Sequence, residues 1–329
     1  VEPGIASYRP AADVSGNIVI AGSDTMQPLM ARLATEFRQW YPDTKIAVQG
    51  GGTESALMQF LSDQATIRRG DAFYKGHQVS GSVSLLASSR ELSHQESDEF
   101  QSRYGYQPTK VPIAMDAVAI YVNRANPIPG LTLPQVDAIF GTTRKRGLQE
   151  DIRTWGQVGL RDDWESQPVH LYGRDKKSGT RSFFKHEALL DGEFRAEVTE
   201  EVGSASEILA LSRDVLGIGY AGIGFQASTV RVVPLAEKAE MPYVHPTAES
   251  AANGTYPLGR PLYLYVKKDP KADLAPVILE FLKFINSHEG QQAAVKAGLY
   301  PLSRTQVAES LHTLTGSAGA TTSATALSH

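Results

Sequence analysis

The sequence predicts an α/β protein made of two lobes. The main observation is a recurring unit: a short run of β-forming residues, a turn rich in Gly, Ser and Thr, and an amphipathic helix. Strands that alternate with helices indicate a largely parallel sheet, with binding loops at the carboxyl ends of its strands. A second observation is a pair of longer β-like runs at 117–123 and 261–268, which enclose a block with helices and a strand of its own.

The clearest unit is "NIVIAGSDTMQPLMARLATEFRQWYP", which starts at residue 17. Residues 17–21 are typical of a strand. The helix behind the turn is predicted by apolar residues three and four positions apart, namely Met26, Leu29, Met30, Leu33 and Phe37. This spacing gives the helix one apolar face that must pack on a sheet.

The other units follow the same order. "TKIAVQGGGTESALMQFLSD" starts at residue 44 and "SVSLLASSRELSHQESDEFQSRYG" at residue 82, and the fourth unit lies within 168–190. The enclosed block adds the helical patterns "TLPQVDAIFG" and "SASEILALSRDV" and the strand-like "GIGYAG". After residue 268, "LAPVILEFLKFINSHEGQQAAVKAG" predicts two helices that need a sheet to pack on.

The economical arrangement builds one lobe from both ends of the chain and inserts the other. We expect lobe 1 to comprise 14–121 and 264–310, and lobe 2 to comprise 122–263. A lead at 1–13 and a flexible Ser/Thr/Ala/Gly-rich tail at 311–329 complete the chain. Two lobes joined by crossover strands can close like a hinge over a site between them.

Composition excludes several functional classes. The 329 residues carry a net charge of −4, which argues against a nucleic-acid-binding protein. The chain has no Cys, which excludes disulfides, thiolate metal sites and a cysteine nucleophile. No apolar run reaches the 18 or more residues of a membrane span. The opening "VEPGIASYRPAADVSG" lacks the layout of a signal peptide and fits a processed mature protein or an artificially shortened chain.

The stretch "GRDKKSGTR" at 173–181 has the chemistry of an anion site. The first turn of a helix leaves N–H groups without partners and favours negative charge. Ser178 and Thr180 add hydroxyl donors, Gly179 allows close approach of the backbone, and Arg174 or Arg181 could supply a two-pronged donor. The alternative is that Ser178 only caps the helix.

Similar turns lie at 22–26, 50–55 and 88–92, each at the start of a predicted helix. Taken singly, each is explained by helix capping or by a tight turn. Together they favour a tetrahedral oxyanion, because four oxygens that each accept up to about three hydrogen bonds need roughly a dozen donors.

The motifs "GSDTM", "GGGTES", "SSREL", "MDAVAIYVN", "GRDKKSGTR" and "GIGYAG", in this order, resemble the periplasmic phosphate-binding proteins of phosphate ABC transporters. The resemblance runs from about residue 17 to 303. "GRxxxSGT" is its most specific element, and "GIGYAG" and "YPLGRPLYLYV" support it. It implies a type II periplasmic-binding-protein fold, in which two α/β lobes close over one phosphate.

The resemblance also implies the residues that contact phosphate. Thr25 would do so through its hydroxyl and its amide, and Met26 through its amide. Thr53 stands where the family has a serine and keeps the hydroxyl. The remaining expected contacts lie in the same turns, at Ser23, Asp24, Gly52, Ser89, Arg90, Arg174, Ser178, Gly179 and Thr180.

One departure from the family concerns selectivity. The best-known members carry in the third turn an aspartate that accepts the proton of hydrogen phosphate, whereas this turn reads Ser88-Ser89-Arg90. Rejection of a fully deprotonated oxyanion needs an acceptor. We expect Asp24 in that role, with Asp116 as the second candidate, and Arg90 as the ion-pair partner of either aspartate. Alternatively, Asp24 is a helix N-cap and Asp116 a residue of a strand-end turn.

Residues 65–82 exceed the usual length of a helix–strand connection and predict an inserted loop or hairpin near the cleft. The "RGD" within it is a coincidence by default. The role of this insertion is left open.

The expected function is a monomeric receptor that captures inorganic phosphate outside the cytoplasmic membrane, in the periplasm or secreted, and hands it to a membrane permease without a cofactor or metal. Alternatives are a receptor for sulfate, molybdate or a phosphonate, an adhesion or scavenging protein with the same lobes, and a phosphoester-processing enzyme. The enzyme is disfavoured because the eight His form no metal motif and "GSDTM" is no nucleophile elbow.

Overall fold

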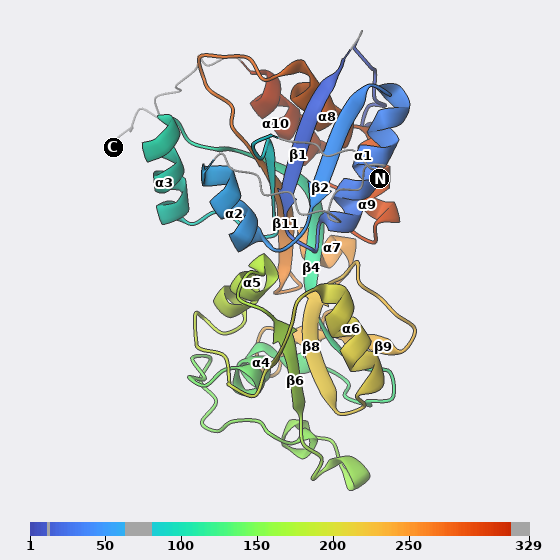
Figure 1. The fold of residues 1–329 in the computed structure, drawn as a ribbon. Helices are drawn as coiled ribbons and strands as arrows, with labels where there is room; N and C mark the ends of the chain where they lie inside the picture. Colours follow the sequence, from blue (N-terminus) through green and yellow to red (C-terminus); the bar gives the residue numbers. More distant parts are fainter. Residues whose placement is uncertain (12–13, 63–80, 317–329) are drawn as a thin grey trace, which may run out of the picture.

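The computed structural model describes residues 1–11, 14–62 and 81–316. These residues form two lobes, lobe 1 above lobe 2 in Figure 1. The predicted insertion at 65–82 lies almost wholly outside the described residues, and so does the tail beyond 316. Within the described part of the chain, helices are too short or too polar to cross a membrane.

Lobe 1 is built from both ends of the chain. Its elements are β1 (Gly16–Gly22), α1 (Gln27–Trp40), β2 (Thr44–Gln49), α2 (Thr53–Ser62), β3 (Leu85–Ser88), α3 (His94–Tyr104), the first part of β4 (Thr109–Asn123), β11 (Gly259–Val266), α8 (Pro276–Ile285), α9 (His288–Lys296) and α10 (Arg304–Thr315).

Lobe 2 lies between β4 and β11 in the sequence. Its elements are β5 (Leu131–Thr132), α4 (Leu133–Phe140), two short 3-10 turns (Trp155–Val158 and Asp162–Trp164), β6 (His170–Arg174), α5 (Gly179–Glu187), β7 (Thr199–Glu201), α6 (Ser204–Arg213), β8 (Gly217–Gly222), β9 (Val230–Val233) and β10 (Leu235–Ala236). The short α7 (Ala248–Ala252) packs beside β4 and β11 where the lobes meet.

A single path of strands runs through both lobes in the order β2-β1-β3-β11-β4-β8-β6-β7, with β9 also on β4. Pairing is parallel within β2-β1-β3 and within β8-β6-β7, and antiparallel around β11 and β4. The two-lobe α/β fold predicted from the sequence is confirmed.

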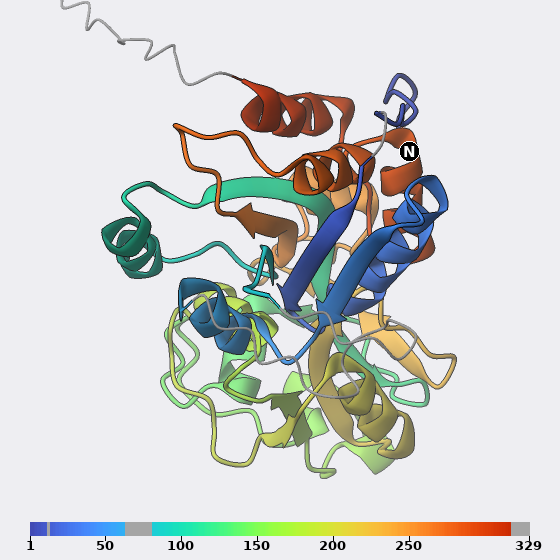
Figure 2. The ribbon, with the colours of Figure 1, turned by 45° about the horizontal axis from the view of Figure 1, so that its top comes forward.

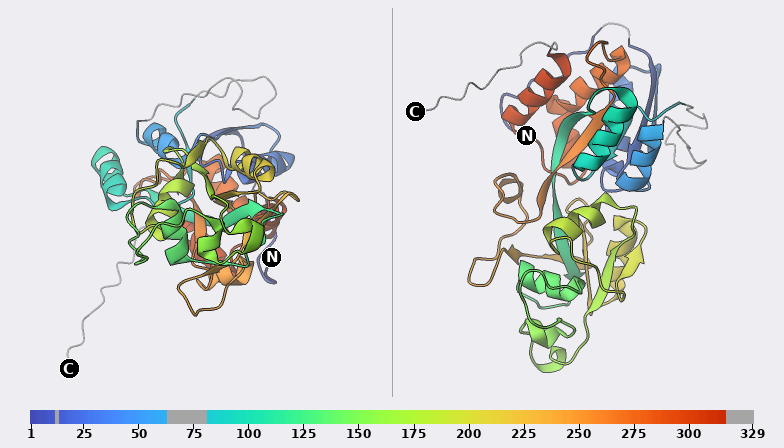
Figure 3. Two further views of the ribbon diagram at one scale, coloured as in Figure 1. Left: turned by 90° about the horizontal axis from the view of Figure 1, so that it is seen from below. Right: turned by 90° about the vertical axis from the view of Figure 1, so that its left-hand side faces the viewer.

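The strand β4 connects the lobes, as the right panel of Figure 3 shows. It pairs with β11 up to Ala117 and with β8 from Val118 onward. The strand β11 pairs with the lobe 1 part of β4 from Gly259, its first residue. This pairing favours lobe boundaries near 117/118 and 258/259, and the predicted boundaries of 121/122 and 263/264 stay a prediction.

The lobe 1 sheet is buried on both faces because its strand residues alternate between two cores. Ile18 and Ile20 face the core under α1, α8 and α9, whereas Val19 and Ala21 face the core under α2 and α3. Figure 2 shows these helices on opposite sides of the sheet. The predicted apolar face of α1 is fully buried, at Met26, Leu29, Met30, Leu33 and Phe37.

Both terminal segments pack more closely on lobe 1 than their composition indicated. Tyr8 in the expected lead is buried, and its hydroxyl donates to Glu280 Oε2 at 2.8 Å and lies 2.9 Å from the Tyr41 hydroxyl. At the other end, α10 continues to Thr315, beyond the expected start of the tail at 311. The buried side chain of Leu314 in the last turn explains the longer helix, because it anchors that turn to the core.

Candidate functional site

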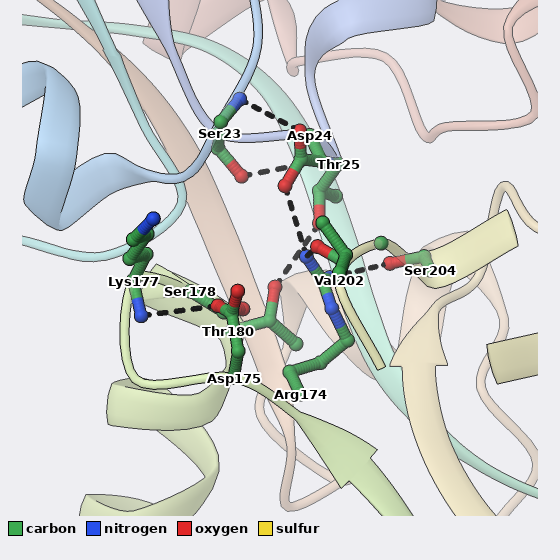
Figure 4. A network of polar contacts seen from close by, with 12 residues as sticks. Ser23, Asp24, Thr25, Arg174, Asp175, Lys177, Ser178, Thr180, Val202 and Ser204 are labelled. Atoms are coloured by element: carbon green, nitrogen blue, oxygen red, sulfur yellow. Dashed lines mark hydrogen bonds and ion pairs between the residues drawn. The ribbon is translucent and has the colours of Figure 1, made fainter. Parts of the chain in front are cut away.

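The Ser/Thr/Gly turns of the two lobes meet at the lobe junction. The hydroxyls of Thr25, after β1, and Thr180, at the start of α5, lie 3.0 Å apart. The Thr53 hydroxyl at the start of α2 lies 3.3 Å from that of Ser89, after β3. A Cβ on Gly179 would come within 2.5 Å of Thr53 Oγ1, so these backbones are in close contact. The predicted convergence of distant turns is therefore present, as Figure 4 shows for part of it.

Arg174, the last residue of β6, is buried in this junction with 1% of its surface exposed. Its Nη1 donates to Ser204 Oγ at 2.8 Å, and its Nη2 donates to Val202 O at 3.1 Å and to Asp24 Oδ2 at 3.0 Å. Its Nε is buried and has no partner among the described residues. A buried unpaired donor is unusual and marks a place where a ligand can be accepted.

The structure distinguishes the two arginines of the "GRDKKSGTR" turn. Arg181 points away from the junction, since its Nη1 donates to Arg174 O at 2.8 Å and pairs with Glu200 Oε1 at 3.1 Å. Its guanidinium also lies over the ring of Phe194, 4.2 Å from the centroid. Arg174 is therefore the arginine of this turn that faces the junction, and its unpaired Nε is the donor it can offer there.

The sequence left open whether Ser178 caps α5 or serves an anion, and it does cap the helix. Its Oγ accepts from the amide of Arg181 at 3.2 Å. The hydroxyl proton is still free to donate, so capping and anion binding do not exclude each other. The side chain is 2% exposed and lies at the junction beside Thr180.

The first turn uses part of its donors internally. The amide of Met26 donates to Ser23 O at 3.0 Å, and the amide of Thr25 donates to Ser23 Oγ at 3.2 Å. The Met26 side chain is buried in the lobe 1 core. The expected contacts of these amides with an anion stay predictions, and each has a competing partner within the turn. In the second turn, the amide of Gly52 also has a partner, since it donates to Gly22 O at the end of β1 at 3.1 Å.

Asp24 is no helix cap, because α1 has no side-chain cap and begins after Met26. Its Oδ1 accepts from the amide of Gly51 at 2.8 Å, and its Oδ2 accepts from Arg174. The carboxylate therefore lies at the edge of the anion turns of both lobes. This position agrees with the expected acceptor role and does not test it.

The prediction that Arg90 forms an ion pair with one of the two aspartates is wrong. Its guanidinium donates to Glu54 and Glu96 through Nε, Nη1 and Nη2, and Nη1 also donates to Glu91 O at 2.8 Å. Burial alone lowers the pKa of Arg90, but the hydrogen bonds from the two glutamates outweigh burial and raise it. With five N–H groups used in this way, the side chain has none left for an anion.

Asp116 is also not in a strand-end turn. It lies within β4, is fully buried, and accepts from Arg260 at 3.0 and 2.8 Å and from the amide of Ile223 at 3.1 Å. Its partner is thus Arg260 rather than Arg90. Burial lowers the pKa of Arg260, and the charge of Asp116 opposes this effect.

Sequence reasoning missed two side chains that support the site. Ser204, at the start of α6, holds Arg174, and Arg260, in β11, donates to Thr180 Oγ1 at 3.0 Å. A signal for Arg260 was present: a charged residue interrupts the apolar "YPLGRPLYLYV" strand. A charge in such a strand must have a buried partner.

The two lobes are in contact in this structure. The amide of Glu54, in the first turn of α2, donates to Lys177 O of lobe 2 at 3.3 Å. The Ser182 hydroxyl of α5 donates to Glu54 Oε1 at 2.8 Å. Beside these contacts lies a cavity of about 1000 Å³ lined by residues of both lobes, among them Glu54, Arg90, Ser182 and Arg260.

The fold and the junction define a two-lobe α/β protein whose lobes close on polar turns. A family profile described as the PBP superfamily domain matches residues 8–289. The phosphate-binding protein PstS of Pseudomonas aeruginosa is 42% identical over 302 residues, which cover 92% of this chain and 88% of that protein. The chain therefore belongs to the PBP superfamily and, within it, to the family of the PstS proteins.

Solved structures agree with the fold of this family. An ABC-type phosphate transport receptor from Vibrio cholerae is 25% identical with a TM-score of 0.63, covering 87% of this chain and 100% of that one. A phosphate-binding protein from Stenotrophomonas maltophilia shares the fold at 15% identity, with a TM-score of 0.64 and coverage of 90% and 93%.

Proposed function

We propose that the chain binds inorganic phosphate between its two lobes and delivers it to the permease of an ABC transporter. The observation that carries the proposal is the meeting of the Thr25 and Thr180 hydroxyls, 3.0 Å apart, next to the buried Arg174. Hydroxyls from different lobes with a buried guanidinium are the donors that a dehydrated oxyanion needs. The names of the Pseudomonas and Vibrio relatives support phosphate as that oxyanion.

Closure of the lobes has a direct chemical role in this proposal. It removes the anion from water, whose hydrogen bonds would compete with each protein donor. The starts of α2 and α5 add the positive ends of two helix dipoles, which favour an anion beside them. The loaded and empty forms then differ in shape, which a permease can recognise.

Asp24 is the proposed acceptor that rejects sulfate. A carboxylate has about four lone-pair sites, and Gly51 and Arg174 occupy two of them. Hydrogen phosphate can donate its proton to a remaining site, whereas sulfate at neutral pH has no proton and would place two acceptors against each other.

Membership of the PstS family also supports a proposal for the wider setting. We propose a monomer that works outside the cytoplasmic membrane, in the periplasm or secreted, and meets its permease only transiently. It needs no cofactor and performs no catalysis, since the site supplies donors to an anion and the expected chemistry is capture and release.

Isothermal titration of ligand-stripped protein with phosphate, arsenate and sulfate tests the proposal. Phosphate and arsenate should bind one per chain, and sulfate should not bind. If sulfate, molybdate or a phosphonate bound more tightly than phosphate, that oxyanion would be the ligand instead of phosphate. Turnover of a chromogenic phosphate ester that survives repurification would favour an enzyme instead.

A further inference from the structure

Arg260 lies where the lobes join, on the inner side of the crossover strands. In the β4–β11 pairing it stands opposite Asp116. Its surface is 2% exposed and that of Asp116 is 0% exposed. Nothing in the proposed function so far uses this buried ion pair.

The contacts of the guanidinium reach from the hinge strands into the anion turn. Its Nε and Nη2 donate to Asp116 Oδ2 at 3.0 and 2.8 Å, and Nη2 also donates to Thr180 Oγ1 at 3.0 Å. Its Cζ lies over the ring of Phe183, 5.0 Å from the centroid. The Nη1 group is buried without a partner among the described residues. The guanidinium thus lies between the Asp116 carboxylate and the Thr180 hydroxyl and contacts both.

The direction of the hydrogen bond has a chemical consequence, because a guanidinium only donates. Thr180 Oγ1 must accept from Arg260, so the single proton of this hydroxyl points elsewhere. Among the described residues, the other hydrogen-bond neighbour of Thr180 Oγ1 is Thr25 Oγ1, 3.0 Å away in the junction, and it can receive this proton. Donation from a cation also polarises the hydroxyl and strengthens it as a donor.

We propose that Arg260 is a positioning residue of the anion site, held by Asp116, which fixes Thr180 as a hydrogen-bond donor to the bound oxyanion. The proposal rests on the function proposed above and specifies it further. A hydroxyl that is fixed as a donor favours an oxygen that only accepts. The site should therefore prefer the dianion of phosphate to the monoanion.

The test measures phosphate affinity by isothermal titration in four forms of the full chain. They are wild type, Thr180→Val, the double variant Asp116→Asn/Arg260→Met, and the triple variant. The double variant removes both charges, because Arg260→Met alone would leave a buried carboxylate without a partner. We expect it to lose roughly 10- to 100-fold in affinity, the size of a hydrogen bond to a charged group.

In the Thr180→Val background, the same two changes should lower phosphate affinity by less than about 3-fold, since the hydroxyl through which Arg260 acts is gone. Fully additive losses would overturn the proposal. A merely structural role also predicts no change in pH dependence. In the double variant, however, the rise in affinity across the second ionisation of phosphate should flatten.

Arg195→Met is the matched control. Arg195 is a buried arginine of lobe 2 that pairs with Asp151 at 3.0 Å, and it makes none of its recorded contacts with the anion turns. Its loss should leave phosphate affinity within about 2-fold of wild type, because losing a buried arginine at this place does not change the donors of the anion turns.

Should the double variant not fold, Arg260→Lys keeps the charge while removing the fork that spans Asp116 and Thr180. It should weaken binding measurably, and wild-type affinity with a wild-type pH profile would overturn the proposal. A wild type that binds no oxyanion would instead defeat the proposed function itself.

Discussion

Asp24 of lobe 1 and Arg174 of lobe 2 form an ion pair across the lobe junction, with 3.0 Å between Oδ2 and Nη2. The proposed phosphate acceptor and the main cationic donor therefore contact each other directly. An anion that uses Arg174 must lie close to a carboxylate. Such a place is unfavourable for an anion unless it brings a proton to share, which is the property that separates hydrogen phosphate from sulfate.

Asp24→Asn should therefore gain sulfate binding, because the amide can offer a donor where the carboxylate offers only acceptors. Phosphate should still bind. Titration with both anions measures the change. Asp175→Asn is the control, since it makes the same neutralising change in the lobe 2 turn, where Asp175 Oδ1 accepts from Lys177 N. Unchanged selectivity in Asp24→Asn would exclude this residue as the acceptor.

Arg174→Met should weaken phosphate binding by at least roughly 30-fold, because loss of a buried charged partner costs about 2 kcal/mol or more. Arg181→Met should change it by less than about 3-fold, since Arg181 faces Glu200 and Phe194 and not the junction. Titration of both variants gives the comparison. Equal losses in the two would contradict the assignment of Arg174.

Gly179→Ala should hold the lobes apart. Its Cβ would lie 2.5 Å from Thr53 Oγ1 and 2.7 Å from Ser89 Oγ, both on the opposite lobe. We expect phosphate affinity to fall roughly 10- to 100-fold, the effect of overpacking. Small-angle scattering should show no contraction with phosphate. Gly203→Ala is the control, because a Cβ there meets no atom within 4 Å; normal closure of Gly179→Ala would refute this reading.

Glu207 should make stability depend on pH. Burial raises its pKa to about 8, and the hydrogen bond from Tyr220 N only partly opposes this. The folded state thus holds the proton more tightly than the unfolded chain. This contribution is complete below the unfolded pKa and is lost as pH rises through about 8.

Between pH 5 and 9, the free energy of unfolding should accordingly fall by ~2–4 kcal/mol more in wild type than in Glu207→Gln. The glutamine keeps the acceptor for Tyr220 N and cannot ionise. Urea unfolding of both proteins at the two pH values measures the difference. Parallel behaviour would show that Glu207 does not carry this proton.

The lobes and their turns were predictable because they depend on local patterns. The spacing from Met26 to Phe37 defined α1, and the Gly-Ser-Thr turns after each strand placed the donors at one edge of the sheet. Parallel strands bring such turns together whatever the details of packing. The gathering of the turns after β1, β2 and β3 follows from this rule, whereas the contact of Thr25 with Thr180 also depends on how β4 and β11 place the two lobes.

Charge pairing was not predictable, because it depends on which side chains meet in space. The sequence-based prediction pairs Arg90 with an aspartate, whereas the Arg90 side chain contacts Glu54 and Glu96. The choice between Arg174 and Arg181 needed the direction of each side chain. Arg260 was overlooked because the register of two strands distant in sequence decides that it faces Asp116.

The carbonyl of Lys177 gives the closed arrangement a further property. It accepts from the amide of Glu54 at 3.3 Å and so completes the first turn of α2 from the opposite lobe. When the lobes separate, this amide is left to solvent, because the first turn of a helix offers it no internal partner. Its hydrogen–deuterium exchange therefore reads out, at a single backbone position, the fraction of time that the two halves spend together.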